Sequence, residues 1–297
     1  MRPLPPTLAA VALLGLAARL PAHDFWIEPE RFRTAPGERT EVALLVGHGA
    51  EVTPFARRAE RIVRFDHVDR TGTRPIPGLE GRHPAGLAVP RDGGPSWVVY
   101  RSTRAFLTLP AERFEPYLRE EGLEKVIALR ADRGDAGAPG REAYSRCCKA
   151  LLGTPGPDDA AFVARPVGLA LELVPERDPR LPGADSGLPL RLLRDGRPVE
   201  GARVDLHPLR PGELGDPVAT ARTDADGRVR LSASGPGRWL VASVDMAEAA
   251  ADVDADWESV WTTLAFEIGP PTAPASKHDA GAAPDPEEGT GDTPDDG

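Results

Sequence analysis

The feature that most constrains the fold of this 297-residue chain is a series of short apolar runs separated by turn residues. Alternating runs of about four to eight residues are typical of β-strands, whereas helices need longer ones. Asp-Gly pairs at residues 195–196 and 226–227 favour tight hairpins. We therefore expect a mainly β protein, with strands at residues 40–46, 61–68, 97–100, 105–109, 168–174, 188–193, 202–206, 217–223, 228–231, 238–244 and 261–268.

The strand pattern is interrupted in the middle of the chain. After Pro110, apolar residues recur at spacings of three and four, and residues 123–129 continue in the same way. Residues 141–152 (REAYSRCCKALL) also place most of their apolar side chains on one helical face. The spacing predicts a helical insert at about residues 110–152.

The insert divides the chain into two β-sandwich-like parts, at residues 23–165 and 166–268. The second part has seven candidate strands in about a hundred residues, which is typical of a β-sandwich. Its segments RPVEGA (197–202) and TDADG (223–227) are similar to the strand pair and hairpin of pre-albumin-like, carboxypeptidase-regulatory domains. This resemblance implies a Greek-key-like fold for the second part.

The N-terminus has the form of a secretory signal peptide, predicted at residues 1–22. A basic start is followed by the apolar run LAAVALLGL, which is too short for a transmembrane helix, and then by small residues. Cleavage after Ala22 leaves Leu20 at the −3 position, whereas cleavage after Ala17 has small residues at both required positions but a shorter apolar run. The protein is expected in the periplasm or secreted, with no transmembrane segment in the mature chain.

Charge excludes one class of partner. The chain has 36 basic and 46 acidic residues, and no basic cluster stands out. Nucleic-acid binding is therefore not expected, because phosphate neutralisation supplies most of that affinity. Residues 269–297 are rich in Pro, Ala, Gly and Asp without apolar periodicity, which predicts a disordered acidic tail.

The sequence carries none of several enzyme motifs. It has no phosphate-binding GxxxxGK[ST] loop, no HExxH zinc motif and no GxSxG nucleophile elbow. Cys147 and Cys148 are adjacent, so a disulfide between them would close a strained ring. We expect them to be buried small residues, with a thiol pair for a soft metal as the alternative. The predicted role is non-enzymatic.

His23 would acquire unusual chemistry if cleavage follows Ala22, because it would then carry the free α-amino group. The pKa of such an amine, about 7.7–8.0, is well below that of lysine. The amine and the imidazole Nδ1 of one residue can chelate one ion, and a second imidazole would complete a histidine brace. Nitrogen ligands in this arrangement suit Cu(II) and Ni(II). The sequence therefore predicts a divalent transition-metal site, with a plain surface residue as the alternative.

His48 is the candidate for the second imidazole, because it lies between two glycines at the end of the first clear strand. A simple turn residue is the other interpretation. His67 lies inside a strand pattern and is expected to be a core histidine. His207 precedes Pro208 at a strand end and is a weaker ligand candidate. Phe25 and Trp26 are expected to be core residues of the first strand.

The segment HDFWIEP (23–29), directly after a signal peptide, resembles the start of the domain of unknown function 4198 family. Its members are exported bacterial proteins often labelled as periplasmic components of cobalt or nickel transport. The resemblance extends to residues 46–48, 144–152 and 256–259. It implies cleavage after Ala22 and a membrane metal transporter as partner.

The same resemblance points to a third ligand position. Family members often carry a histidine before the methionine that follows strand 238–244, and this chain has Asp245 there. The resemblance implies that Asp245 takes the place of that histidine, with weaker binding or a preference for a harder ion.

The leading hypothesis is thus an exported protein that binds nickel, cobalt or copper through His23, His48 and Asp245. It would act as an accessory or substrate-binding component of metal uptake. The alternative is a metal-free module of the cell envelope that recognises protein or glycan through an exposed aromatic patch around Trp257 and Trp261. A copper oxygenase using the same brace is a third hypothesis, and it would require redox turnover.

Overall fold

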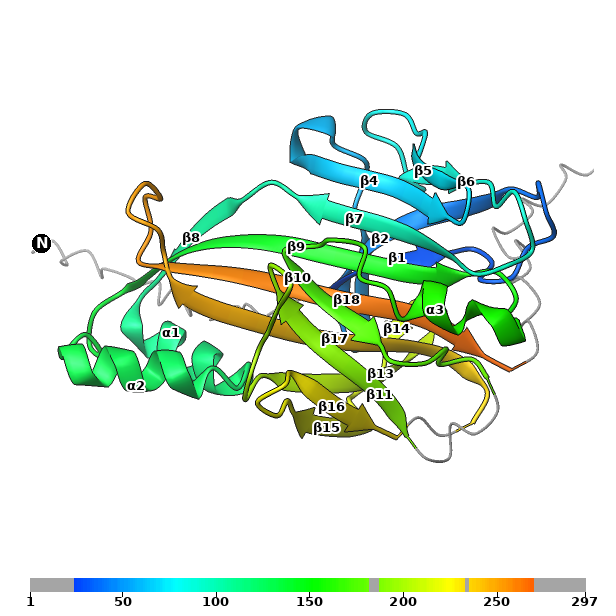
Figure 1. The fold of residues 1–297 in the computed structure, drawn as a ribbon. Helices are drawn as coiled ribbons and strands as arrows, with labels where there is room; N and C mark the ends of the chain where they lie inside the picture. The colour runs from blue at the N-terminus through cyan, green and yellow to red at the C-terminus, as the bar shows by residue number, and fades with distance from the viewer. Residues whose placement is uncertain (1–23, 182–186, 233–234, 270–297) are drawn as a thin grey trace, which may run out of the picture.

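Strands dominate the structure: 49% of the described residues lie in strands and 12% in helices, which confirms the mainly β prediction. The computed structural model describes residues 24–181, 187–232 and 235–269 (Figure 1). The predicted signal peptide, His23 and the acidic tail after residue 269 lie outside these residues.

Strands of the first half are β1 (Asp24–Pro29), β2 (Thr40–His48), β3 (Glu51–Pro54), β4 (Ile62–Asp69), β5 (Gly72–Pro75), β6 (Gly86–Ala88), β7 (Ser96–Ser102), β8 (Ala105–Leu109) and β9 (Gly140–Leu152). Strands of the second half are β10 (Leu171–Pro175), β11 (Leu188–Arg194), β12 (Arg197–Pro198), β13 (Arg203–Arg210), β14 (Glu213–Leu214), β15 (Ala219–Arg222), β16 (Arg228–Leu231), β17 (Gly237–Glu248) and β18 (Trp257–Ile268). Helices are α1 (Ala111–Glu120), α2 (Glu124–Arg133) and α3 (Ala160–Val163), with short 3₁₀ turns η1 (Ala59–Arg61) and η2 (Pro157–Asp159).

A ten-stranded sheet forms the centre of the molecule, in the order β14-β13-β17-β18-β9-β7-β4-β5 with β15 on β13 and β8 on β9. A four-stranded sheet contains β1, β2, β3 and β6, and another contains β10, β11, β12 and β16. Among the described strands, β9 and β18 are paired in parallel and the other pairs are antiparallel. The central sheet therefore contains strands from both halves of the chain.

Each face of the central sheet packs against one of the smaller sheets. Trp97 and Cys147 point to the face covered by the sheet of β10 and β11. Their neighbours Val98 and Cys148 point to the face covered by the sheet of β1 and β2. Successive side chains of a strand alternate between the two faces, so strands β7 and β9 contribute side chains to both hydrophobic cores. The central sheet therefore forms a sandwich with each smaller sheet, and it contains strands from both sides of the predicted boundary at residues 165/166.

The prediction of a helix at residues 141–152 is wrong, because this segment is the central strand β9. Strand β9 is buried on both faces, with Leu151 in one core and Cys148, Ala150 and Leu152 in the other. A strand with apolar residues on both faces shows no period of two, so its spacing can imitate that of a helix. The helical insert is therefore limited to α1 and α2.

The adjacent cysteines of β9 lie on opposite faces of the sheet, and both are buried. The Cys148 thiol donates to the carbonyl oxygen of Phe25 at 3.2 Å. Burial raises the pKa of Cys148 to about 12, so the thiol is protonated. Two side chains on opposite faces cannot hold the same metal ion, which supports the structural role of this pair.

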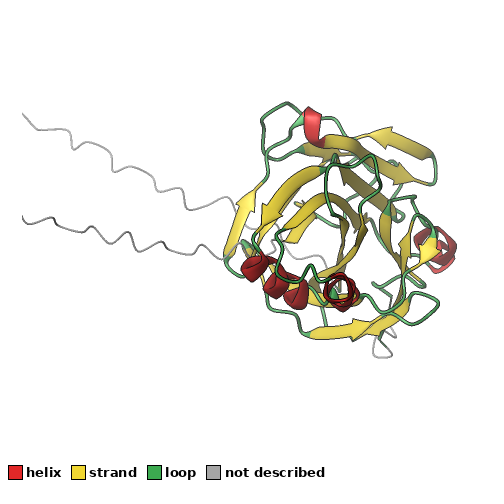
Figure 2. Cartoon of the chain, turned by 90° about the vertical axis from the view of Figure 1, so that its left-hand side faces the viewer, coloured by secondary structure: helices red, strands yellow, loops and turns green. Residues whose placement is uncertain are grey.

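Helices α1 and α2 form a hairpin at one end of the central sheet, the end that faces the viewer in Figure 2. Phe114, Leu118 and Val126 of the hairpin pack against Met246 and Trp257 of β17 and β18. No helix among the described residues is long and apolar enough to cross a membrane.

The same packing contradicts the exposed aromatic patch of the alternative hypothesis. Trp257 is 2% exposed beneath the hairpin. Trp261 is half-buried, and its ring stacks on Tyr117 of α1 with 6.3 Å between ring centroids. Their apolar surfaces are covered by the chain's own helices.

Candidate metal site

A cavity of about 180 Å³ opens on the face of the central sheet where the β1–β2 sheet and the helical hairpin meet. Its apolar lining comes from Pro217, Ala242, Val244 and Trp261. Its polar lining consists of Asp24, His48, Glu120, Glu121, Arg203, Asp205, His207 and Ser243. Four carboxylates against one arginine make the cavity acidic, and two imidazoles line it.

Strand β1 holds the start of the described chain firmly against the central sheet. Phe25 and Trp26 are 3% and 1% exposed, as expected for core residues. The carbonyl oxygen of Phe25 accepts hydrogen bonds from the Cys148 thiol and, at 2.9 Å, from the Thr263 hydroxyl. Asp24 is consequently fixed at the cavity. His23, the preceding residue in the sequence, lies outside the described residues.

His48 is exposed at the end of β2, beside the register pair of Asp24 and Gly47. A Cβ atom on Gly47 would lie 2.3 Å from the carbonyl oxygen of Glu51, so only glycine permits the close approach of β3 here. The tight hairpin places the His48 imidazole at the cavity. The structure therefore brings His48 close to the residue that follows His23.

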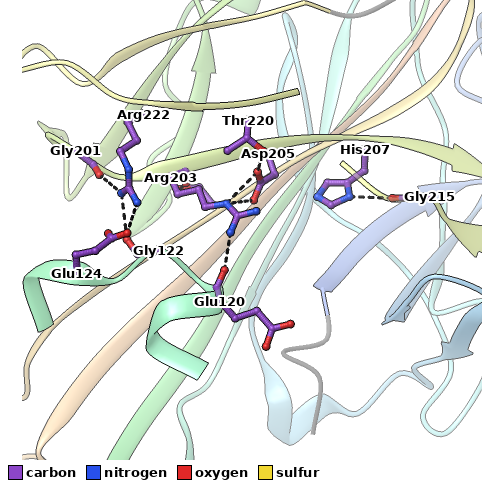
Figure 3. A network of polar contacts seen from close by, with 11 residues as sticks. Glu120, Gly122, Glu124, Gly201, Arg203, Asp205, His207, Gly215, Thr220 and Arg222 are labelled. Carbon is purple, nitrogen blue, oxygen red and sulfur yellow. Dashed lines mark hydrogen bonds and ion pairs between the residues drawn. The ribbon is translucent and has the colours of Figure 1, made fainter. Parts of the chain in front are cut away.

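His207 is the ligand candidate that the sequence pattern ranked too low. It lies on β13, it is 6% exposed, and its Nδ1 is 3.0 Å from the carbonyl oxygen of Gly215 (Figure 3). A carbonyl can only accept, so Nδ1 carries a proton, and in the neutral imidazole Nε2 carries the lone pair. Metal-binding histidines commonly donate their other nitrogen in this way. The missed signal was the alternation that puts Asp205 and His207 on one face of the strand.

Two carboxylates of the cavity lack hydrogen-bond partners among the described residues. Burial raises the pKa of Asp24, and the charges of His207 and His48 oppose that effect. Burial, and then the charge of Asp24, raise the pKa of Glu121 well above its usual range. No hydrogen bond from another described residue reaches either carboxylate. A cation would stabilise both groups in their charged forms.

The other charged pair of the cavity is already satisfied. Arg203 Nε lies 2.8 Å from Oδ2 of Asp205, and Oδ1 of the same carboxylate accepts from the Thr220 hydroxyl. Arg203 Nη1 donates to the carbonyl oxygen of Glu120 at 2.6 Å (Figure 3). Asp205 is therefore neutralised, and Arg203 ties the end of α1 to β13.

Asp245 is not brought together with His48. Its neighbour Val244 faces the hairpin and the cavity, whereas the Asp245 carboxylate points to the opposite face of β17 and binds Arg194 Nη1 at 2.9 Å. Successive residues of a strand point to opposite faces. Asp245 lies with Arg194 and Lys125 along a separate groove.

His67 has the core role expected of it. Arg74 donates to its Nδ1 at 3.1 Å, so Nε2 carries the proton and donates to the Ser96 hydroxyl at 2.9 Å. Burial, together with the charge of Arg74, lowers the pKa of His67 to about 4. Both ring nitrogens have partners, and neither can bind a metal without losing one.

The described residues alone do not form a complete ligand set. Within residues 24–181, 187–232 and 235–269, no three His, Cys, Asp or Glu side chains are close enough together to hold a metal ion. Asp24, His48 and His207 surround the cavity without closing on one point. A complete set of metal ligands would need at least one group from outside these residues.

A family model described as "Domain of unknown function (DUF4198)" matches residues 20–246. The matched region begins before β1, ends in β17 and contains Asp24, His48, Glu121 and His207. No curated protein and no solved structure shows a significant match to the chain. Because the family model covers well over half of its length, the chain belongs to the DUF4198 family.

Proposed function

We propose that this protein is an exported carrier that binds a divalent transition-metal ion, nickel, cobalt or copper, in the cavity at the start of β1. The observation that carries the proposal is the buried His207 imidazole. Its Nδ1 donates to the carbonyl oxygen of Gly215. The Nε2 lone pair of the neutral imidazole is then available to a metal ion in the cavity, which His48 and Asp24 also line. His67 shows how the same side chain is arranged when it serves only the core.

The donor types fit such an ion. Imidazole nitrogen suits nickel, copper and zinc, and a carboxylate adds negative charge. Cleavage after Ala22 would add the amine and Nδ1 of His23, one residue from Asp24. Three imidazoles, an amine and a carboxylate would then be available around one cavity, enough to complete the set that the described residues leave open.

The position of the cavity suits delivery to a partner. His48 is exposed at its rim, whereas His207 is buried within it. An exposed ligand can be exchanged for a ligand of another protein while the buried ones still hold the ion. We therefore propose a membrane metal transporter as the recipient, and a role in binding and transfer without catalysis.

Metal titration of the mature protein tests the proposal. Affinities for Ni(II), Co(II) and Cu(II) are measured for chains that begin at His23, with and without one extra N-terminal alanine, and for the His207→Gln variant. We expect His207→Gln to lower the affinity about 100-fold, which is the upper range seen even for outer-sphere partners of metal ligands. The extra alanine should weaken Cu(II) and Ni(II) binding by converting the amine into an amide.

His83→Gln is the matched control, because His83 is exposed in a loop away from the cavity. It should leave every affinity unchanged. Absence of metal binding by the unmodified mature chain, or equal binding by the His207→Gln variant, would contradict the proposed site. Equal binding by the extended chain would remove only the His23 amine from it.

A further inference from the structure

The turn between α1 and α2 forms the wall of the cavity opposite β1. Glu120 and Glu121 at the end of α1 line the cavity together with Asp24. No residue of the hairpin is among the ligands expected from the sequence. The hairpin nevertheless supplies two of the four carboxylates of the cavity lining.

Two arginines hold this turn against the central sheet. Arg203 of β13 donates to the carbonyl oxygen of Glu120 at 2.6 Å, and Arg222 of β15 donates to that of Gly122 at 3.2 Å (Figure 3). Arg222 also forms an ion pair with Glu124. Gly122 has a φ of +68°, and a Cβ atom there would lie 3.0 Å from the Arg203 side chain. The backbone around Glu121 is thus placed closely against β13.

This placement makes Glu121 and Asp24 line the same cavity from different elements. The charge of Asp24 acts on Glu121, and neither carboxylate accepts a hydrogen bond from another described residue. The nearby Arg203 is occupied by Asp205 and Glu120. Holding two carboxylates together without a shared donor is unfavourable unless a proton or a cation comes between them. The buried His207, whose Nε2 has no hydrogen-bond partner among the described residues, lines the same cavity and is an independent observation for binding there.

We propose that Glu121 and Asp24, on opposite walls of the cavity, form a carboxylate pair that neutralises the charge of the bound metal ion. This inference rests on the proposed metal-binding function. The hairpin then contributes a charged side chain to the site, and Arg203 and Arg222 are positioning residues that hold Glu121 in place. Because Glu121 follows α1 and Asp24 belongs to β1, an ion bound between them would link the two elements, and we expect it to slow hydrogen exchange in the hairpin.

The pair also affects which metal is preferred. Carboxylate oxygen is a hard ligand, whereas Cu(II) gains most of its affinity from nitrogen ligands. Loss of one carboxylate should therefore weaken Co(II) binding more than Cu(II) binding. A general effect of net charge would weaken both equally.

The experiment compares Glu121→Gln with Glu112→Gln in the full mature chain. Glu112 lies in the first turn of α1, away from the cavity, so its variant controls for net charge. Co(II) and Cu(II) affinities are measured by titration calorimetry, and hydrogen exchange of residues 111–133 is measured with and without metal. Thermal unfolding of the metal-free variants verifies that both are folded.

We expect Glu121→Gln to lower the Co(II) affinity about tenfold and the Cu(II) affinity less, and to abolish metal-dependent protection of the hairpin. Glu121→Asp should restore part of both effects, and Glu112→Gln should behave as the unmodified chain. If the unmodified chain binds metal and Glu121→Gln binds it equally, or if both glutamine variants lose the same affinity, this inference is overturned while the proposed function stands. If the unmodified chain binds no metal, the proposed function fails first.

Discussion

The two buried histidines, His67 and His207, differ in the hydrogen bonds that their ring nitrogens form. In His67, Nδ1 accepts from Arg74 and Nε2 donates to Ser96, so the imidazole is fully satisfied in the interior. In His207, Nδ1 donates to Gly215, and Nε2 is left toward an acidic cavity. The comparison shows that two histidines with similar burial can differ in their hydrogen-bond partners among the described residues. Both ring nitrogens of His67 have a hydrogen-bond partner, whereas only one ring nitrogen of His207 has one among the described residues.

The carboxylates of the two regions differ in the same way. Glu172 is 1% exposed, and it accepts from Lys149 Nζ at 2.7 Å and from the backbone amides of residues 167–169. Asp24 and Glu121 have no such donors among the described residues. Buried polar groups in proteins are nearly always hydrogen-bonded. The partners of Glu172 stabilise the fold, whereas Asp24 and Glu121 line the cavity in which we propose that a cation binds.

The largest change in the free energy of unfolding is expected from removing the buried ion pair between Lys149 and Glu172. Replacing Lys149 by Met leaves the Glu172 carboxylate buried without its counter-charge, and loss of one partner of such a pair costs about 3–5 kcal/mol. Urea unfolding should show this decrease in the free energy of unfolding, whereas metal affinity should not change. Lys125→Met is the control, since Lys125 is exposed. A decrease no larger than that of the control would mean that Glu172 does not depend on Lys149.

A somewhat smaller effect is expected from titrating His67. Its pKa is about 4 in the folded protein and about 6.5 in the unfolded chain, so the unfolded state binds the proton first as the pH falls. Stability should therefore decrease between pH 6.5 and pH 4, by up to about 3 kcal/mol. Glutamine can keep both hydrogen bonds without titrating, so the His67→Gln variant should lose less stability over this range. Parallel stability curves for the two proteins would contradict the assignment.

The smallest change in the free energy of unfolding is expected from replacing Asp245. This variant also tests whether a side chain on the far face of β17 contributes to metal binding. Asp245 and Arg194 are 26% and 22% exposed in their ion pair, so Asp245→Asn should lower the free energy of unfolding by about 1 kcal/mol or less. Its metal affinity should equal that of the unmodified chain, in contrast to His207→Gln. A tenfold loss of affinity would instead support the role that the family resemblance implies for Asp245.

Local patterns determined much of the fold. Alternation and turn residues located most of the strands, and helical spacing located α1 and α2. Strand β9 was assigned wrongly because both of its faces are buried, and burial on two faces depends on layers supplied by distant segments. The same layers decide that Cys147 and Cys148 belong to different cores.

The site was predictable only in part. By itself, the sequence indicated a β-rich chain and gave His48 as the candidate partner of an N-terminal histidine. The pairing of β1 with β2, which places Asp24 beside Gly47, was decided by the tertiary structure. Tertiary structure alone decided that His207 and Glu121 face the same cavity and that Asp245 does not. The reason is physical: a shift of one residue along a strand reverses the face of a side chain, and the pairing of β13, β17 and β18 sets that register.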